Sequence, residues 1–153
     1  MGNARFVGTY YRSLDAKGRL LLPPPFMAAI EKSCNGSRAA PSFWLTSLYG
    51  RITGYFPEDW EQIAEQLCTI RTPSLKLSNF KTKLLGMAHE LAPDSQGRVR
   101  IPQPLLREGD LIKDIVLVGI FDKFEIWNQT HFEAVPNEDI SEELTSYGIQ
   151  IKL

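Results

Sequence analysis

Short stretches of apolar, aromatic and β-branched residues alternate with polar turns, and this pattern predicts a chain rich in β-strands. The first two strands are expected at Thr9–Leu14 and Arg19–Leu22, joined by Asp15-Ala-Lys-Gly18. In such a turn the aspartate can bond its own backbone, and glycine adopts positive φ without a Cβ clash. A tight turn therefore joins the two strands.

The next part of the chain predicts a short helix and a hairpin. Pro23 to Pro25 lack the amide hydrogen that a strand ladder needs, so the second strand ends there, and Phe26–Lys32 has the composition of a helix. A hairpin is predicted next, with strands over Phe43–Leu48 and Ile52–Phe56 and a turn at Tyr49-Gly-Arg51. The first half thus combines strands with a helix between them.

A longer helix is expected to follow directly from Pro57. Proline suits a first helical position, and the negative charges of Glu58 and Asp59 are favourable beside the positive end of the helix dipole. These carboxylates need no acid or base role to explain them. One apolar face has helical spacing and consists of Trp60, Ile63, Ala64 and Leu67.

The second half repeats this order of elements. Ile115–Ile120 and Phe124–Trp127 are expected strands, and Thr130 with Glu133 has the spacing of a capping box for a helix that includes Phe132. The linker between the halves, Arg71–Lys83, carries four basic residues and no acidic one among interleaved leucines. This linker could form an amphipathic helix or a basic face. We favour a third interpretation, a plain connector between the repeats with solvated lysines.

Two short sequences show that the halves are related. DAKGRLLLP, Asp15–Pro23, returns 79 positions later as DSQGRVRIP, Asp94–Pro102. Ile52–Ile63 matches Phe124–Val135 at an offset of 72, which places the seven extra residues in a loop over 33–41. Two copies are too few for a solenoid, so we expect a duplicated small domain. The predicted organisation is a first repeat over 1–70, a linker over 71–88, a second repeat over 89–136 and an acidic tail over 137–153.

Composition is that of an ordinary globular protein. The chain has 153 residues, of which 43% are hydrophobic, and it can bury one sizeable core or two small fused ones. Neither a membrane-spanning stretch nor the apolar core of a signal peptide is apparent, so a cytoplasmic location without membrane contact is expected. Cys34 and Cys68 are too few for a disulfide scaffold and are expected to be free thiols.

Charge is distributed unevenly although the net charge is only −1. Residues 1–38 hold six basic and two acidic residues, while residues 123–153 hold two basic and six acidic ones. Clustered charge rather than net charge attracts phosphate, so a polyanion would meet the first third of the chain. The alternative is that these are ordinary solvated charges. The acidic C-terminal segment, which includes Ile149 and Ile151, is interpreted either as a flexible tail or as a segment that binds a neighbouring subunit.

The paired D-x-x-G-R turns, the strings LDAKGRLLLP and GRVRIP, and the closing segment VLVGIFDKFEIWNQTHFE resemble the MraZ family of the AbrB-like swapped-hairpin superfamily. The resemblance runs from about Phe6 to Val135. It implies an α+β, β-rich fold of two pseudo-symmetric, interlocked barrel halves with helices packed outside. It also implies ring-shaped homo-oligomers that bind repeated promoter boxes in double-stranded DNA of the bacterial division and cell-wall gene cluster, usually as repressors in the cytoplasm and nucleoid.

Several cations are candidates for contacts with DNA. Arg can pair with phosphate or donate two hydrogen bonds to guanine, and a ring multiplies the repeated arginines into a spaced row. The candidates are Arg5, Arg12, Lys17, Arg19 and Arg98.

A structural role competes with recognition at the turns. Asp15 and Asp94 can accept hydrogen bonds from turn amides and pair with Arg19 and Arg98, so the two aspartates, with Gly18 and Gly97, are assigned to holding the turns. The two arginines are balanced between the roles, whereas recognition is favoured for Arg5, Arg12 and Lys17.

The chain departs from the family pattern where cations are common. Val7 follows Phe6 in place of arginine, Met27 follows the aromatic after the first proline segment, and Asn79-Phe-Lys81 replaces an arginine-rich linker. An alternative function is therefore an oligomeric protein-interaction module that has lost tight DNA binding.

Catalysis finds no support in the sequence. His89 and His131 lie far apart without metal-ligand spacing, and neither a phosphate-binding glycine loop nor a nucleophile motif is present. We expect no enzyme activity, cofactor, metal or small-molecule substrate, and an enzyme on a related barrel is a distant third hypothesis.

Overall fold

The computed structural model describes residues 4–35 and 40–153. The loop expected over 33–41 lies partly outside the described residues, as do the first three residues of the chain. Among the described residues, none of the helices combines the length and apolar character needed to cross a membrane.

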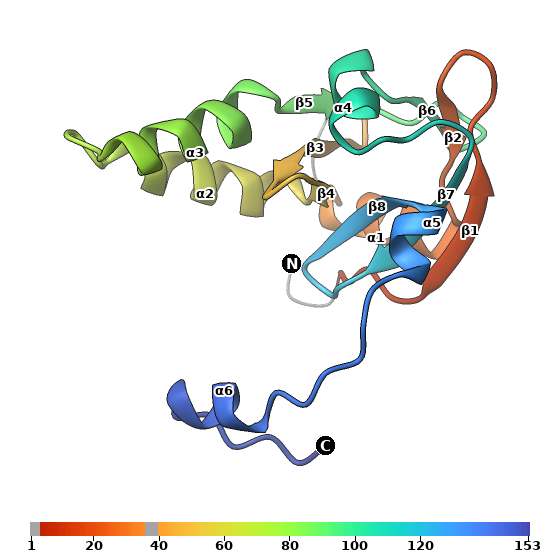
Figure 1. The fold of residues 1–153 in the computed structure, drawn as a ribbon. Helices are drawn as coiled ribbons and strands as arrows, with labels where there is room; N and C mark the ends of the chain where they lie inside the picture. The colour runs from red at the N-terminus through yellow and green to blue at the C-terminus, as the bar shows by residue number, and fades with distance from the viewer. Residues whose placement is uncertain (1–3, 36–39) are drawn as a thin grey trace.

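The elements of the two repeats follow the same order (Figure 1). The first repeat contains β1 (Thr9–Ser13), β2 (Arg19–Leu21), α1 (Pro24–Ser33), β3 (Phe43–Leu48), β4 (Arg51–Tyr55) and α2 (Pro57–Cys68). After α3 (Leu75–Gly86), the second contains β5 (His89–Leu91), β6 (Arg98–Arg100), α4 (Gln103–Glu108), β7 (Asp114–Gly119), β8 (Lys123–Asn128) and α5 (Gln129–Glu133). A last helix, α6 (Ser141–Ser146), lies apart from the body of the molecule.

Strands of the two repeats are exchanged within one antiparallel sheet. Its order is β1-β7-β8-β4-β3-β5, so the first strand of each repeat pairs with the hairpin of the other. Exchanging equivalent strands between the repeats gives the same order read backwards, which places a pseudo-two-fold axis between β8 and β4. The expected β-rich α+β fold is confirmed, and the exchange explains how the halves interlock.

A second, two-stranded sheet joins the repeats through equivalent strands. β2 pairs with β6 in antiparallel register, with Leu20 opposite Val99 at the centre. The ladder continues into the turns, where the Leu22 amide donates to the Gly97 carbonyl at 2.9 Å and the Ile101 amide donates to the Gly18 carbonyl at 3.0 Å. The two D-x-x-G-R turns therefore flank one ribbon, which we call the β2–β6 ribbon.

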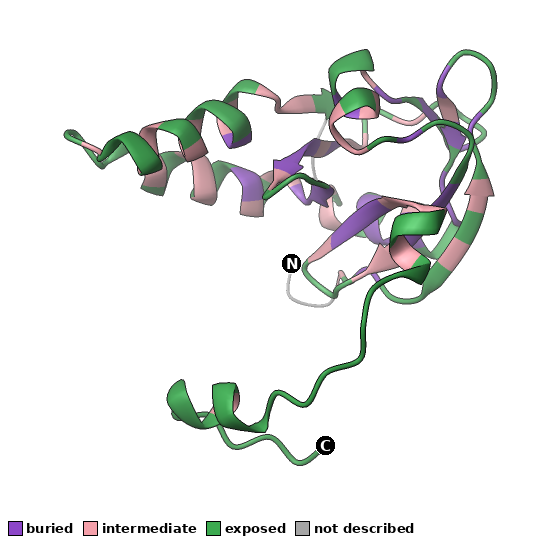
Figure 2. Cartoon of the chain, in the orientation of Figure 1, coloured by how far each residue is buried: buried purple, intermediate pink, exposed green. Residues whose placement is uncertain are grey.

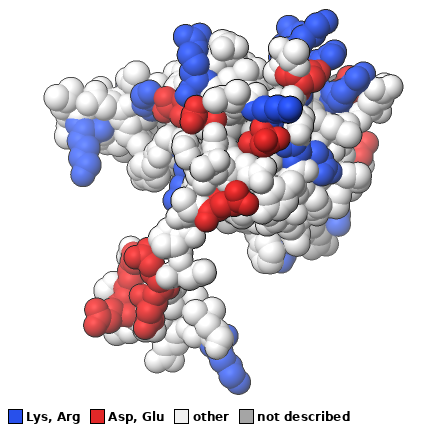
Figure 3. Space-filling view, turned by 45° about the vertical axis from the view of Figure 1, so that its right-hand side comes forward, with Lys and Arg blue, Asp and Glu red and all other residues white. Residues whose placement is uncertain are grey.

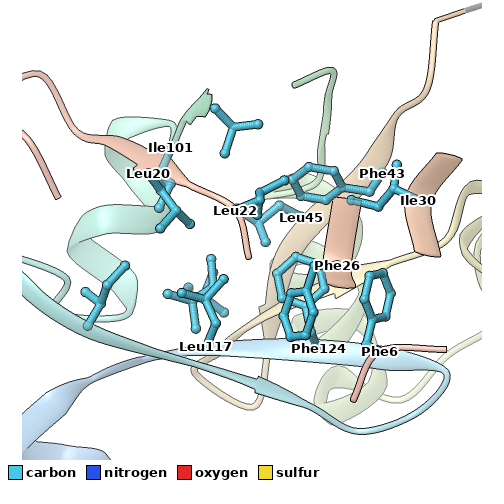
Figure 4. Packing of buried hydrophobic residues seen from close by; sticks show 14 of the residues in the cluster. Phe6, Leu20, Leu22, Phe26, Ile30, Phe43, Leu45, Ile101, Leu117 and Phe124 are labelled. Atoms are coloured by element: carbon cyan, nitrogen blue, oxygen red, sulfur yellow. The ribbon is translucent and has the colours of Figure 1, made fainter. Parts of the chain in front are cut away.

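Both repeats contribute to one core (Figures 2 and 4). Phe6 stacks on Phe56 with ring centroids 4.3 Å apart and meets the edge of Phe26 at 5.2 Å and of Phe124, from the second repeat, at 4.8 Å. Burying one such side chain stabilises the fold by roughly 1.5–3 kcal/mol. The core therefore joins the two repeats, because Phe124 of the second repeat packs against Phe6 and Phe26 of the first.

The linker forms a helix that packs on α2 and β3. Ser74 caps α3 by accepting from the Leu77 amide at 3.1 Å, and Thr46 donates its buried hydroxyl to the Leu84 carbonyl at 2.6 Å. Lys83 pairs with Glu108 of α4 at 3.0 Å. The linker is therefore helical and turns an apolar side to the sheet, as the amphipathic-helix alternative has it, while Lys76 and Lys83 are exposed as the connector interpretation expects.

Two local predictions are corrected by the helix ends. Helix α1 begins at Pro24, not Phe26, because amides of the first turn have no intrahelical partner and their absence costs nothing there. Asn128, not Thr130, caps α5 by accepting from the His131 amide at 3.1 Å. Thr130 lies inside this helix, so the predicted capping box does not form.

Replacing Gly18 by Val is expected to lower the free energy of unfolding by about 1–3 kcal/mol, because the backbone there has positive φ that Val tolerates poorly. Its φ is +74°, and an added Cβ would lie 3.1 Å from Leu106 Cδ1. Urea denaturation measures the change. Gly86→Ala is the control, since Gly86 ends α3 with open space around its Cβ position. Equal stability of both variants would contradict this account of the turn.

Candidate nucleic-acid interface

The first turn is held by both oxygens of the Asp15 carboxylate. Oδ1 accepts from the backbone amides of Lys17 and Arg19, each at 2.9 Å, and Oδ2 accepts from Arg19 Nε at 2.6 Å. The Gly18 amide closes the turn by donating to the Asp15 carbonyl at 3.0 Å. One carboxylate thus fixes both the backbone of the turn and the direction of the arginine.

The second turn repeats this geometry almost bond for bond. Asp94 Oδ1 accepts from the amides of Gln96 and Arg98 at 2.9 Å, and its Oδ2 lies 3.3 Å from Arg98 Nε. Hydrogen bonds from the Arg19 amide hold the pKa of Asp15 down to about 2, and the Arg98 amide likewise lowers the pKa of Asp94. Both carboxylates are therefore ionised at neutral pH and offset part of each arginine's charge.

The β2–β6 ribbon has an apolar inner face and a basic outer face. Leu20 and Val99 are buried, and alternation along the strands directs their neighbours to the opposite side. The outer face consists of Arg19, Leu21, Arg98 and Arg100. Lys and Arg gather over this part of the molecule with acidic residues between them (Figure 3).

Arg100 was missed by sequence reasoning, although the repeat contained a signal for it. It occupies the position that Leu21 occupies in the first copy, and the register places it directly opposite Arg19. A comparison of the copies shows the difference in side chain. Only the pairing of β2 with β6 shows that the two guanidinium groups share one face.

Each turn packs against a helix of the other repeat. Leu106 of α4 lies against the first turn at Gly18, and Met27 of α1 lies against the second at Gly97. Leu106 and Met27 are 79 positions apart, the offset of the turns themselves. Met27 is therefore a packing residue that lies against the second turn.

Two further candidate residues, Lys17 and Arg12, lie at or next to the first turn. Lys17 lines a hollow of about 480 Å³ beside this turn, together with Arg107 of α4, Asp15 and Asp110. Arg12 lies on β1, the strand that leads into the turn, where its Nη1 donates to the Tyr11 carbonyl at 3.0 Å. Lys17 thus lies in the first turn, two residues before Arg19, and Arg12 lies on the adjoining strand.

Arg5 lies at the opposite end of the ladder between β1 and β7. Its guanidinium is 5.1 Å from the ring centroid of Phe121, while the first turn follows the far end of β1. The surrounding hollow, of about 410 Å³, is also lined by Glu58, Asp59 and Asp122. Partial burial, followed by the nearby Asp122 charge, raises the pKa of Asp59. This environment disfavours a second anion.

The two histidines and Val7 lie outside the β2–β6 ribbon. His89 Nδ1 lies 3.0 Å from the Met87 carbonyl, and His131, which lies in α5, is 3.7 Å from Asp110. Val7 is exposed. Over residues 4–35 and 40–153, no cluster of three or more histidine, cysteine or acidic side chains is arranged to hold a metal ion.

Comparison with known proteins decides the family. The model of the MraZ protein family, described as antitoxin-like, matches residues 5–76 and 84–147. The chain belongs to the MraZ family. Its sequence resemblance to that family is thereby confirmed.

Relatives within the MraZ family match along nearly the whole chain. The transcriptional regulator MraZ of Maridesulfovibrio salexigens is 37% identical over 150 residues, which cover 96% of this chain and 98% of the relative. That of Nitratidesulfovibrio vulgaris, strain Hildenborough, is 37% identical over 94% and 96% of the two chains. That of Lactobacillus helveticus is 32% identical over 88% and 90%. MraZ proteins are transcriptional regulators by name, which confirms that this chain is not an enzyme.

Replacing Asp15 by Asn should make the stability of the fold less dependent on pH below about pH 4. The folded-state pKa is about 2 against an ordinary 3.8, so Asp15 stabilises the fold above pH 4 and loses this effect as pH falls from 4 to 2. Thermal unfolding across this range should show a smaller slope in Asp15→Asn than in the wild type. Glu61→Gln, which removes an exposed carboxylate of α2, is the control and should keep the wild-type slope. Identical slopes in all three proteins would exclude this role for Asp15.

Proposed function

We propose that this chain is a DNA-binding transcriptional regulator that contacts double-stranded DNA through the outer face of the β2–β6 ribbon. The observation that carries the proposal is the presence of three arginines on one face of a two-stranded ribbon, with a rigid turn at each end. The family names of the relatives support the regulatory role.

The shape and chemistry of the ribbon suit the major groove. That groove admits a two-stranded β-ribbon, and an arginine there can donate two hydrogen bonds to guanine O6 and N7. Arg19 and Arg98 use Nε for their aspartates, and no hydrogen bond among the described residues engages their terminal nitrogens, which remain available for this purpose. Lys17 at the exposed end of the turn is suited to a phosphate. The fixed turns reduce the entropy lost on binding.

Affinity in this proposal comes from assembly rather than from one chain. The net charge is −1, and Asp15 and Asp94 offset part of the arginine charge, so one copy of the ribbon binds weakly. Linking several copies raises the effective concentration of each. We therefore include in the proposal a homo-oligomeric ring on repeated promoter boxes of the division and cell-wall gene cluster, acting as a repressor in the cytoplasm at the nucleoid.

The other candidate cations, Arg12 and Arg5, are proposed to contribute unequally to DNA binding. Arg12 belongs to the DNA-facing surface because its strand leads directly into the first turn. Arg5 is assigned a minor contribution, because Glu58, Asp59 and Asp122 line the same hollow and repel phosphate. The second candidate function, a protein-interaction module without tight DNA binding, is favoured by Val7 and Met27, which lack the cations common in the family.

A salt titration tests the proposed function. The assembled wild-type protein is titrated with a duplex from upstream of its own operon and with a shuffled duplex of the same composition. Preferred binding of the first duplex, with affinity falling steeply as salt rises, is expected from release of counterions at contacted phosphates. Equal, weak binding of both duplexes would instead favour the interaction module.

Arg19→Ala should weaken DNA binding without unfolding the turn. The Asp15 contacts to the amides of Lys17 and Arg19 remain, so the circular dichroism spectrum and oligomer size should match the wild type and the pKa of Asp15 should stay below 3.8. Lys76→Ala, which removes an exposed cation of α3, is the control and should bind like the wild type. Loss of fold in Arg19→Ala would show that the arginine is structural.

A further inference from the structure

The β2–β6 ribbon departs from two-fold symmetry at one pair of positions. The pseudo-two-fold axis relates Arg19 to Arg98 and Leu20 to Val99, which are alike in character. It also relates Leu21 to Arg100, which are not alike. A ribbon with equal strands would present the same side chains when turned by half a revolution, whereas this ribbon does not.

Both differing side chains are accessible. Leu21, which lies opposite Arg98, is 49% exposed, and Arg100, which lies opposite Arg19, is exposed on the same outer face. Arg19 and Arg98 are each tied to an aspartate, but no hydrogen bond or ion pair links the side chain of Arg100 to another residue that the structure describes. The guanidinium group of Arg100 therefore belongs to an exposed residue and is not engaged by the described residues.

The fold does not explain the placement of Arg100. Like charges directly opposite one another on an antiparallel pair are destabilising, and Arg100 lies opposite Arg19. Leu21 keeps about half of its side chain exposed, although its Cδ1 lies only 3.8 Å from the position that a Cβ on Gly97 would occupy. A bound polyanion, in contrast, relieves the repulsion between the two guanidinium groups. The arrangement suits a ligand better than it suits the free protein.

We propose that the difference between Leu21 and Arg100 makes the ribbon read DNA in one direction, with Arg100 as a specificity-determining residue. Arg100 donates two hydrogen bonds to O6 and N7 of a guanine on one side of the ribbon. Leu21 offers an apolar contact to a thymine methyl on the other side. The recognised box is therefore non-palindromic. This inference rests on the proposed binding of DNA and adds the residue that gives the box its direction.

The test selects duplexes from a random library with the wild-type protein and with Arg100→Leu, which makes the two strands alike. The wild type should enrich a non-palindromic box, and Arg100→Leu should lose the preference for one guanine while the other preferred bases remain. Replacing that guanine pair should lower wild-type affinity about 5- to 150-fold, the range for one bidentate contact, and leave the affinity of Arg100→Leu unchanged.

Arg107→Leu is the matched control, because it removes the same charge from α4, next to the first turn but outside the ribbon. It should keep the base preferences of the wild type, with at most a uniform loss of affinity. Thermal unfolding should show Arg100→Leu to be as stable as the wild type or more so, since the repulsion with Arg19 is gone.

The outcomes separate this inference from the function on which it rests. If Arg100→Leu enriches the same non-palindromic box as the wild type, or if the wild type enriches a palindrome, the directional role of Arg100 is overturned while DNA binding stands. If the wild type enriches no sequence, the proposed function itself fails.

Discussion

The pairing of β2 with β6 is the contact on which the rest of the structure depends. Two strands of three residues are only marginally stable by themselves, but Leu20 and Val99 anchor this pair on the common core. The pairing also joins the two equivalent strands that follow the first and second turns. The first strand of each repeat is exchanged into the other half, and each turn packs against a residue of the other repeat, so both repeats position both turns.

Rigidity and charge oppose each other at these turns. The aspartate that fixes each arginine also offsets part of its positive charge, and its ionisation is favoured by the same backbone amides that shape the turn. A well-oriented but weakly charged donor favours discrimination between bases over strong attraction to phosphate. Such a surface gains useful affinity when several copies act together, in keeping with the proposed assembly.

The acidic and basic parts of the chain occupy different parts of the molecule. The C-terminal segment that carries α6 extends away from the body, and its surface is largely acidic (Figures 1 and 3). The hollow around Arg5 is acidic as well and lies at the far end of the β1 and β7 ladder from the first turn. Both regions are therefore separated from the ribbon, and their carboxylates do not cancel its positive potential at close range.

Local chemistry was sufficient to predict the turns at Asp15 and Asp94, the hairpin after Phe43 and the helix that begins at Pro57, because neighbouring residues decide these features. Local chemistry did not reveal the exchange of β1 and β5, the packing of α3, the separation of Arg5 from the other cations or the position of Arg100 opposite Arg19. Those features depend on hydrogen bonds and apolar contacts between residues far apart in the chain. The repeat in the sequence showed that two equivalent arginines exist, but only the register between β2 and β6 placed them with Arg100 on one face.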